Sequence, residues 1–358
     1  TYPVTVSGIS SANAITAGYG HTCALLVGGA AQCWGYNAPG QLGNGTITNS
    51  STPVRVNGIS TAIAITAGDY HTCALHLSGT LRCWGYNRFG QLGNGTTTNS
   101  STPVDVSSIS TVTAIAGGRS HTCAVLQGGA VRCWGADNSG QLGNGNTSGP
   151  ELCNGSPCST TPVNVIGMST AASIEAGTNH TCVLLQGGAV QCWGDDILGQ
   201  LGNGISTVAY NAPVSVVGIS TTTAIAAGTN HTCVLLQSGV VECWGDSVWG
   251  FLPPYAAGDI STAAAIAAGR SHTCALLQDG AVQCWGDNSY GQLGNGTTTS
   301  SSTPVNVSGI STATAIVAGI FHTCAVLRGG GVQCWGWNKS GQRGDGTTPN
   351  SLIPVNVS

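Results

Sequence analysis

Short apolar segments alternate along the chain with clusters of glycine and small polar residues, and none keeps the period of an amphipathic helix. Turn-forming residues bound each segment. The pattern therefore predicts an all-β protein of short strands. Over one representative stretch the expected strands are Ala62–Ala67, His71–Leu77, Thr80–Trp84 and either Pro53–Val56 or Pro103–Val106.

One sequence recurs seven times: His-Thr-Cys, nine residues, Cys-Trp-Gly, and then in most copies Gly-Gln-Leu-Gly-Asn-Gly. The first cysteines of successive copies are 41 to 59 residues apart and mostly about 50. This period suits propeller blades and is too long for leucine-rich solenoids. Blades that stack face to face bury both sides of each sheet, so strict alternation is not expected. We predict a single domain over residues 1–358, a seven-bladed β-propeller with four-stranded antiparallel blades.

The cysteines pair naturally within each copy of the repeat. If Val27-Gly28-Gly29 forms a three-residue hairpin loop, Cys23 and Cys33 face each other as a non-hydrogen-bonded pair, the closest arrangement of two side chains across strands. Zinc is the less favoured alternative, because its structural ligands are usually two to four residues apart. We expect one disulfide in each blade and one more in an insertion, formed by Cys23 and Cys33, Cys73 and Cys83, Cys123 and Cys133, Cys153 and Cys158, Cys182 and Cys192, Cys233 and Cys243, Cys274 and Cys284, and Cys324 and Cys334.

Composition narrows the location and the partners. Charged residues make up 6% of the chain, the net charge is -4 and Lys339 is the single lysine, so no basic surface for nucleic acid is expected. No apolar run is long enough to insert in a membrane. The paired cysteines favour an oxidising compartment. Together with a start at Thr1 that suggests removal of a signal peptide, they predict an extracellular or cell-surface protein.

The repeated units, Ala-Gly-x-x-His-Thr-Cys-Ala-Leu, Gly-x-Val-x-Cys-Trp-Gly-x-Asn and Gly-Gln-Leu-Gly-Asn-Gly, resemble those of the regulator of chromosome condensation family over nearly the whole chain. The resemblance implies a seven-bladed propeller and says less about activity. The family includes a nuclear exchange factor with a basic surface, plant photoreceptors with tryptophan and arginine clusters, and secreted bacterial β-lactamase inhibitors. The paired cysteines depart from the intracellular members and indicate the secreted branch.

The repeated polar residues are better explained as scaffold than as an active site. We expect the histidines to be buried hydrogen-bonding posts, with a metal ring or catalysis as weaker alternatives. The tryptophans are expected to pack between blades. The glycine-rich loop carries no lysine and opens no helix, which argues against a nucleotide site. No Gly-x-Ser-x-Gly elbow occurs. We predict that the protein is not an enzyme and needs no cofactor.

Candidate binding residues lie where the copies differ, before the histidine and after Trp-Gly, because the scaffold does not dictate those positions. Ordinary loop drift is the alternative. In the fifth copy, Trp249–Tyr255 replaces the polar loop and is either a plug for a truncated blade or a docking patch. Aromatic residues are enriched among the variable positions, as in contact surfaces. The predicted contact residues are Tyr36, Tyr86, Phe89, Trp249, Phe251, Tyr255, Tyr290, Phe321 and Trp337.

The two ends carry the same outer-strand pattern, Pro-Val-x-Val, within residues 1–7 and 352–358. Both would occupy one slot of a closed ring, so one of them is surplus. A surplus strand that pairs with a neighbouring molecule would build a filament, sheath or coat, and the partner is then a second copy of this chain. The alternative is a monomeric secreted binding module or inhibitor, which engages a protein or glycan through its variable loops.

Sequons of the type Asn-x-Ser/Thr offer glycan acceptors. Because charge is scarce, glycans would add solubility. The predicted acceptors are Asn44, Asn94, Asn179, Asn230, Asn295 and Asn338.

Overall fold

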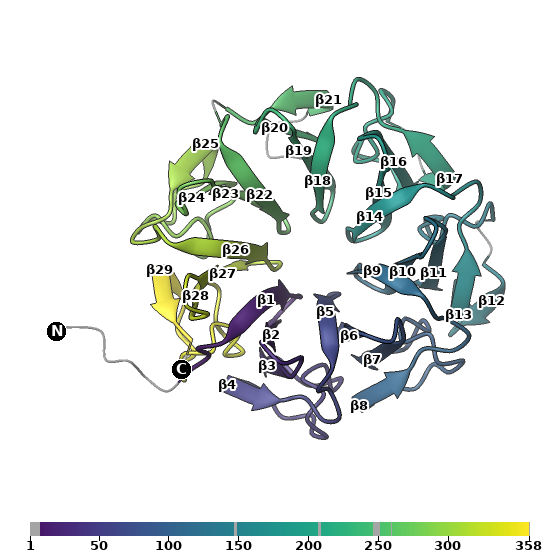
Figure 1. Cartoon of the computed structure of the whole chain (residues 1–358), viewed down its shortest axis with the longest axis horizontal. Coiled ribbons are helices and arrows are strands. Elements are labelled where there is room, and N and C mark those ends of the chain that lie inside the picture. The colour runs from purple at the N-terminus through teal and green to yellow at the C-terminus, as the bar shows by residue number, and fades with distance from the viewer. Residues whose placement is uncertain (1–7, 147–148, 207–208, 246–250, 259, 358) are drawn as a thin grey trace.

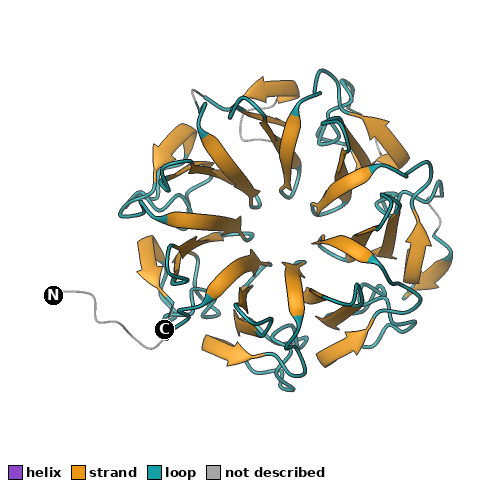
Figure 2. Cartoon of the chain, viewed as in Figure 1, coloured by secondary structure: helices purple, strands orange, loops and turns teal. Residues whose placement is uncertain are grey.

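A computed structural model describes residues 8–146, 149–206, 209–245, 251–258 and 260–357. Seven antiparallel sheets stand around a central axis like the blades of a wheel (Figure 1). Figure 2 shows only strands and loops in the described part of the chain. Nothing there forms a helix long and apolar enough to span a membrane. The predicted all-β, seven-bladed propeller is confirmed.

Each blade runs from an inner strand at the axis to an outer strand at the rim. The first four blades comprise β1 (Ala12–Ala17), β2 (His21–Leu26), β3 (Ala31–Gly35) and β4 (Ser50–Arg55); β5 (Ala62–Ala67), β6 (His71–His76), β7 (Leu81–Gly85) and β8 (Ser100–Asp105); β9 (Val112–Gly117), β10 (His121–Leu126), β11 (Val131–Ala136), β12 (Glu151–Cys153) and β13 (Ser156–Asn164); and β14 (Ala171–Ala176), β15 (His180–Leu185), β16 (Val190–Asp195) and β17 (Ala209–Ser215). The last three comprise β18 (Thr222–Ala227), β19 (His231–Leu236), β20 (Val241–Gly245) and β21 (Phe251–Ala256); β22 (Ala263–Ala268), β23 (His272–Leu277), β24 (Val282–Gly286) and β25 (Ser301–Asn306); and β26 (Ala313–Ala318), β27 (His322–Leu327), β28 (Val332–Gly336) and β29 (Ser351–Asn356).

Disulfides join the second and third strands of every blade. Cys23 and Cys33 are directly opposite in the ladder of β2 and β3, and in all seven blades the Cα atoms of the pair are 4.0 or 4.1 Å apart. With the Cys153–Cys158 bond there are eight disulfides and no free cysteine. The predicted pairing is confirmed, and it is the chemistry of an oxidising compartment. Closing each ten-residue loop contributes on the order of 2–3 kcal/mol.

Two departures from the repeat keep the blade architecture. In the fifth blade Phe251–Ala256 pairs with β20 as β21, so this segment is a complete fourth strand although it lacks the Pro-Val-x-Val pattern. In the third blade the insertion forms a hairpin of β12 and β13, whose turn places Asn154 and Gly155 at positive φ. The insertion around Cys153 and Cys158 thus adds a fifth strand to the third blade.

The hydrophobic core is divided among the interfaces between blades. Between the first two blades, Trp84 packs with Cys23, Cys33, Leu42 and Ile59, all of them no more than 1% exposed. Corresponding clusters form at the other six interfaces. The tryptophans therefore bury their apolar rings between neighbouring blades, as predicted.

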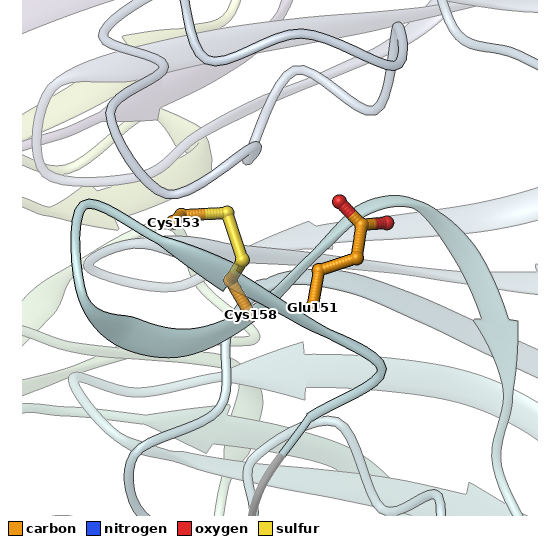
Figure 3. Close-up of side chains that lie close together, drawn as sticks. All are labelled: Glu151, Cys153 and Cys158. Carbon is orange, nitrogen blue, oxygen red and sulfur yellow. A yellow bond between two sulfur atoms is a disulfide. The ribbon is translucent and has the colours of Figure 1, made fainter.

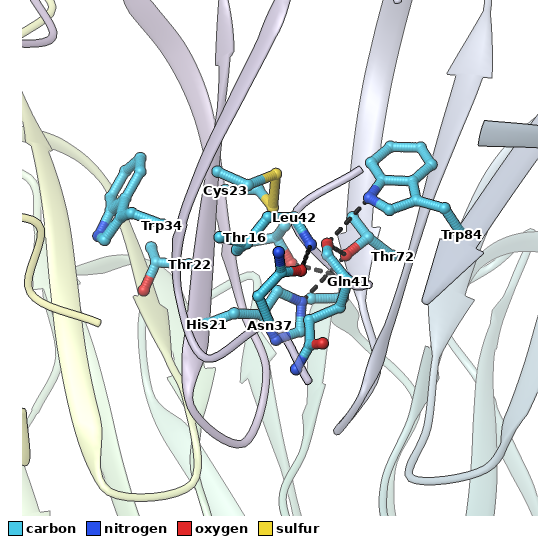
Figure 4. The surroundings of a disulfide bond; sticks show 12 residues. Thr16, His21, Thr22, Cys23, Trp34, Asn37, Gln41, Leu42, Thr72 and Trp84 are labelled. Carbon is cyan, nitrogen blue, oxygen red and sulfur yellow. Dashed lines mark hydrogen bonds between the residues drawn. A yellow bond between two sulfur atoms is a disulfide. The ribbon is translucent and has the colours of Figure 1, made fainter. Parts of the chain in front are cut away.

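A chain of hydrogen bonds crosses the interface between the first two blades (Figure 4), and its histidine–threonine bond recurs at the other six interfaces. The Trp84 Nε1 and the Thr72 hydroxyl both donate to the backbone oxygen of Gln41 in the preceding blade, at 2.9 Å each. The Thr72 oxygen in turn accepts from His21 Nε2 at 3.0 Å. The histidines are buried and hydrogen-bonded, as expected, and their partner is the threonine of the next blade.

The C-terminal strand closes the ring. β29 pairs with β28 in the outer position of the seventh blade, and β26 lies beside β1 across the junction (Figure 1). The slot for which the two ends compete is therefore filled by the C-terminal segment. The other competitor, residues 1–7, lies outside the described residues.

Candidate functional site

The variable residues of both loop sets lie on one side of the wheel, which we call the loop face. The backbone N–H of the residue after Trp-Gly donates to the backbone oxygen of the residue before the histidine. This bond joins Tyr36 to Gly20 at 2.7 Å and Tyr86 to Tyr70 at 2.9 Å. The strand register thus places the two variable positions of a blade next to each other.

Eight aromatic rings form one continuous row on the loop face, and we call this row the aromatic arc. Neighbouring ring centroids are 5.1 to 6.4 Å apart, and most pairs meet edge to face. The arc passes over the sixth, seventh, first and second blades. Its members are Tyr290, Phe321, Trp337, Tyr19, Tyr36, Tyr70, Tyr86 and Phe89.

Each ring of the arc is half-buried. The side chains hold one another in place and still present part of each ring to solvent. Aromatic side chains fixed in this way offer large contact area with little loss of rotamer freedom on binding. Burial, together with the nearby carboxylate of Asp69, raises the pKa of Tyr70 to about 12, so its hydroxyl stays protonated and can donate a hydrogen bond.

Three charged residues stand beside the arc where the central channel opens. Arg119 Nε lies 3.9 Å from Asp69 Oδ2, and the Arg270 guanidinium lies 5.4 Å from the centre of the Phe321 ring. Burial raises the pKa of Asp69 to about 6, although both arginines act in the opposite direction. At the mouth of the channel, arginine cations therefore lie beside aromatic rings, and a cation over the face of such a ring is attracted to it.

The channel behind this mouth has a volume of about 280 Å³ and is lined by the inner strands. Glu175 on β14 places a carboxyl group there, where the first two blades have Thr16 and Thr66. The side chain is exposed to the channel yet surrounded by protein, and this loss of bulk water raises its pKa to about 7. Our sequence analysis missed Glu175; an alignment of the inner strands would have shown one acid among small residues.

The structure brings together six of the nine predicted contact residues: Tyr36, Tyr86, Phe89, Tyr290, Phe321 and Trp337. Tyr255 does not join them. It is half-buried and packs against the core cluster of Cys243 and Ile260 between the fifth and sixth blades, and its role as a contact residue stays a prediction. Trp249 and the side chain of Phe251 lie outside the described part of the chain.

The structure contradicts one of the predicted glycan acceptors. The Asn338 side chain is fully buried, where it donates to the Thr347 backbone oxygen at 2.8 Å and accepts from the Arg343 N–H at 2.9 Å. A glycan cannot be attached to a side chain enclosed in this way. The remaining acceptors, which stay predictions, are partly exposed: Asn44, Asn94, Asn179, Asn230 and Asn295.

Glu151, Cys153 and Cys158 lie close together in the third blade (Figure 3). The two sulfurs are bonded to each other, so they provide no thiolate for a metal. Glu151 accepts a hydrogen bond from the Thr160 hydroxyl at 2.8 Å. The proximity of the three residues is therefore explained by the hairpin of β12 and β13.

The fold and the arc define the class: a disulfide-bonded, seven-bladed β-propeller with aromatic residues gathered on one face. Two models of the regulator of chromosome condensation (RCC1) repeat match the sequence. This chain belongs to the RCC1 repeat family. One model matches residues 13–41, 62–91, 112–141, 171–200, 223–248, 263–292 and 313–342, and the other matches residues 29–75, 78–125, 128–184, 187–235 and 279–326.

Solved structures confirm the fold across distant sequences. Prp20p from Saccharomyces cerevisiae is 22% identical with a TM-score of 0.77, over 98% of this chain and 87% of that one. Human WBSCR16 is 20% identical with a TM-score of 0.81, over 92% and 94%. The ectodomain of the receptor kinase CR4 from Physcomitrella patens is 24% identical with a TM-score of 0.56, over 91% and 74%. A comparison with curated protein sequences gave no match.

Proposed function

We propose that this protein is a non-enzymatic extracellular binding module that engages a protein or glycan through the aromatic arc. The single observation that carries the proposal is the continuous packing of eight rings on one face. Tyrosine, tryptophan and phenylalanine are the residues that dominate recognition surfaces.

The distribution of titratable groups supports binding in preference to catalysis. The largest downward pKa shifts belong to the seven repeated histidines. These side chains form hydrogen bonds between blades and are therefore part of the scaffold. Asp69 and Tyr70, two groups of the loop face whose pKa values are raised, stand beside packed rings and Arg119. Those groups do not form a pair of nucleophile and general base.

An extracellular location is supported by the eight disulfides, because reducing compartments keep such thiols unpaired. The receptor kinase CR4 carries a similar propeller in its ectodomain. A propeller of this kind is therefore compatible with the exterior of a cell.

The test compares the wild-type protein with an arc variant carrying Tyr86→Ala and Trp337→Ala. Retention on the surface and in the extracellular material of the producing cells is measured by quantitative immunoblotting. Leu77→Ser serves as control, because Leu77 is 77% exposed at the β6–β7 turn on the opposite face. The wild-type protein and the control should be retained and the arc variant released, at unchanged melting temperature. Equal retention of all three would refute the proposal.

Self-assembly is the second candidate, and the specific observation in its favour is that β29 already fills the outer slot of the seventh blade. A second Pro-Val-x-Val segment, at residues 3–6, then has no vacant outer position in its own ring. Strand addition to a neighbouring molecule would use it. Sizing and electron microscopy should then show multimers that disappear when residues 1–7 are deleted. A protein that stays monomeric with and without them excludes the filament.

A further inference from the structure

The aromatic arc ends at the third blade, and a groove begins there. Ser120 and Ala136 occupy the two variable positions that hold Tyr70 and Tyr86 in the second blade. The missing rings leave a groove of about 490 Å³ on the loop face. This volume lies within the range of small-ligand sites, about 300–1,000 Å³.

The two sides of the groove differ in chemistry. One side is aromatic and consists of the end of the arc: Tyr36, Tyr70, Tyr86 and Phe89. The other side is polar and comes from the third and fourth blades: Arg119, Ser120, Asn138, Ser139 and Asn179. The base is formed in part by Ala136 and Gln141, which are almost fully buried.

The polar side is suited to hydroxyl groups. Asparagine amides and serine hydroxyls can both donate and accept hydrogen bonds, as ligand hydroxyls can. The faces of aromatic rings carry negative potential and attract the polarised C–H groups of a sugar ring. A pyranose presents hydroxyls at its rim and C–H groups on its face, so it satisfies both sides of the groove at once.

Charge argues for a neutral ligand. Arg119 is the only ionised group among the lining residues, and Asp69 lies 3.9 Å from its guanidinium. An acidic ligand would compete with that carboxylate for a single cation. A proline-rich peptide would use the aromatic side but needs few polar partners, which leaves most of the amides and hydroxyls opposite without a role.

We infer that the groove between the aromatic arc and the third and fourth blades binds an uncharged oligosaccharide, with a sugar ring stacked on Tyr70 or Tyr86 and its hydroxyls bonded to Asn138 and Asn179. This inference rests on the proposed function, specifies the ligand of one end of the arc and replaces the prediction of a glycan on Asn179, because a glycan there would fill the groove. The rest of the arc, toward Tyr290, offers further stacking positions for a longer chain.

Isothermal titration calorimetry with the intact protein tests the inference. The probes are cellohexaose, chitohexaose, maltohexaose, xylohexaose and mannohexaose, with oligogalacturonate and decaproline as charged and peptide comparisons. At least one neutral hexasaccharide should bind, and Ala136→Tyr should lower its affinity at least tenfold by restoring the ring found in the second blade. Asn179→Ser should lower it severalfold without filling the groove, whereas Leu77→Ser on the opposite face should leave it unchanged.

The outcomes separate this inference from the proposed function. If no neutral hexasaccharide binds, or if binding survives Ala136→Tyr in a variant with wild-type melting temperature, the sugar site is overturned. If decaproline or oligogalacturonate binds more tightly than every neutral sugar, the ligand class is wrong. In each case arc-dependent retention on cells still decides the proposed function, because that assay does not assume a ligand.

Discussion

Acidification from pH 7 to pH 5 should destabilise the wheel strongly, because its seven repeated histidines are buried in the neutral form. At six interfaces the threonine hydroxyl donates to a glutamine backbone oxygen, so it must accept its second hydrogen bond from the histidine Nε2–H. This fixes the tautomer. The other ring nitrogen, Nδ1, is buried without a partner in all seven histidines.

A proton on Nδ1 would place an uncompensated charge inside the protein. Burial accordingly lowers the pKa of these histidines from 6.5 to about 3 or 4, with smaller repulsion from neighbouring histidines at several positions. Below pH 6.5 the unfolded chain binds protons that the folded protein does not. Stability is therefore complete above pH 6.5 and is lost progressively as the pH falls toward 3.

The magnitude follows from the two pKa values. Between pH 7 and pH 5 each histidine costs roughly 2 kcal/mol, and all seven together cost about 13 kcal/mol. Four acids act in the opposite direction, because burial raises the pKa of Asp69, Asp137 and Asp196 to about 6 and that of Glu175 to about 7. Together these acids offset about 5 to 6 kcal/mol, with Glu175 counted below its full value because its side chain faces the water of the channel. The net loss is about 7 to 8 kcal/mol, comparable with the whole stability of many proteins.

Guanidinium unfolding with intact disulfides, followed by tryptophan fluorescence, measures this difference at the two pH values. Unfolding at pH 5 should also take up about three to four protons per molecule, a number that calorimetry in buffers of different ionisation enthalpy provides. His71→Gln keeps a donor for Thr122 and should reduce the loss by about 2 kcal/mol. His76→Gln, outside the repeated motif, should reduce it less. A midpoint that stays constant or rises on acidification refutes the neutral-histidine argument.

Two other changes test the loops that carry the variable residues. Asp196 stands where Asn87 stands in the second blade, and its Oδ2 is buried without a partner, so Asp196→Asn should stabilise by about 2 kcal/mol at pH 8 and much less at pH 5, while Asn87→Asp should have the opposite sign. A pH-independent effect in denaturant unfolding would contradict this. Gly43→Ala should lower the melting temperature more than Gly28→Ala, because both glycines have positive φ but only at Gly43 would the new Cβ lie 2.6 Å from Trp84 Nε1. Equal shifts would show that the contact with Trp84 is unimportant.

The fold could be predicted almost completely because the same set of residues recurs at the interfaces between blades. The seven copies of one sequence all predict the same strands, the same facing cysteines and the same buried tryptophan. An ambiguous segment in one copy can therefore be assigned from the other copies. The errors fall where a segment is unique. Phe251–Ala256 has no Pro-Val-x-Val pattern, and it still forms β21 because the open edge of β20 accepts backbone hydrogen bonds from any extended segment.

The site could be predicted only in part. Variability identified six of the eight residues of the arc and not Tyr19 and Tyr70, and the contact between the rings depends on how neighbouring blades are placed around the axis, which no single repeat encodes. Tyr255 illustrates the limit, because its exposure is decided by the core between two blades. Asn338 shows the same limit for sequons: the motif is local, whereas burial of the asparagine depends on the folded loop around Thr347.

In this propeller, backbone hydrogen bonds hold the variable residues of the loop face in place, so that binding and stability depend on different atoms of those residues. The residue after Trp-Gly is held in the scaffold by its backbone, and its N–H donates to the blade's own turn whether the side chain is Tyr36, Ala136, Asp195 or Trp337. Its side chain can therefore change without loss of a hydrogen bond that the scaffold needs. The groove over the third blade differs from the row of rings partly at this position, where Ala136 replaces the Tyr86 of the second blade. For this reason Ala136→Tyr is expected to change what the loop face binds and to leave the ring of blades intact.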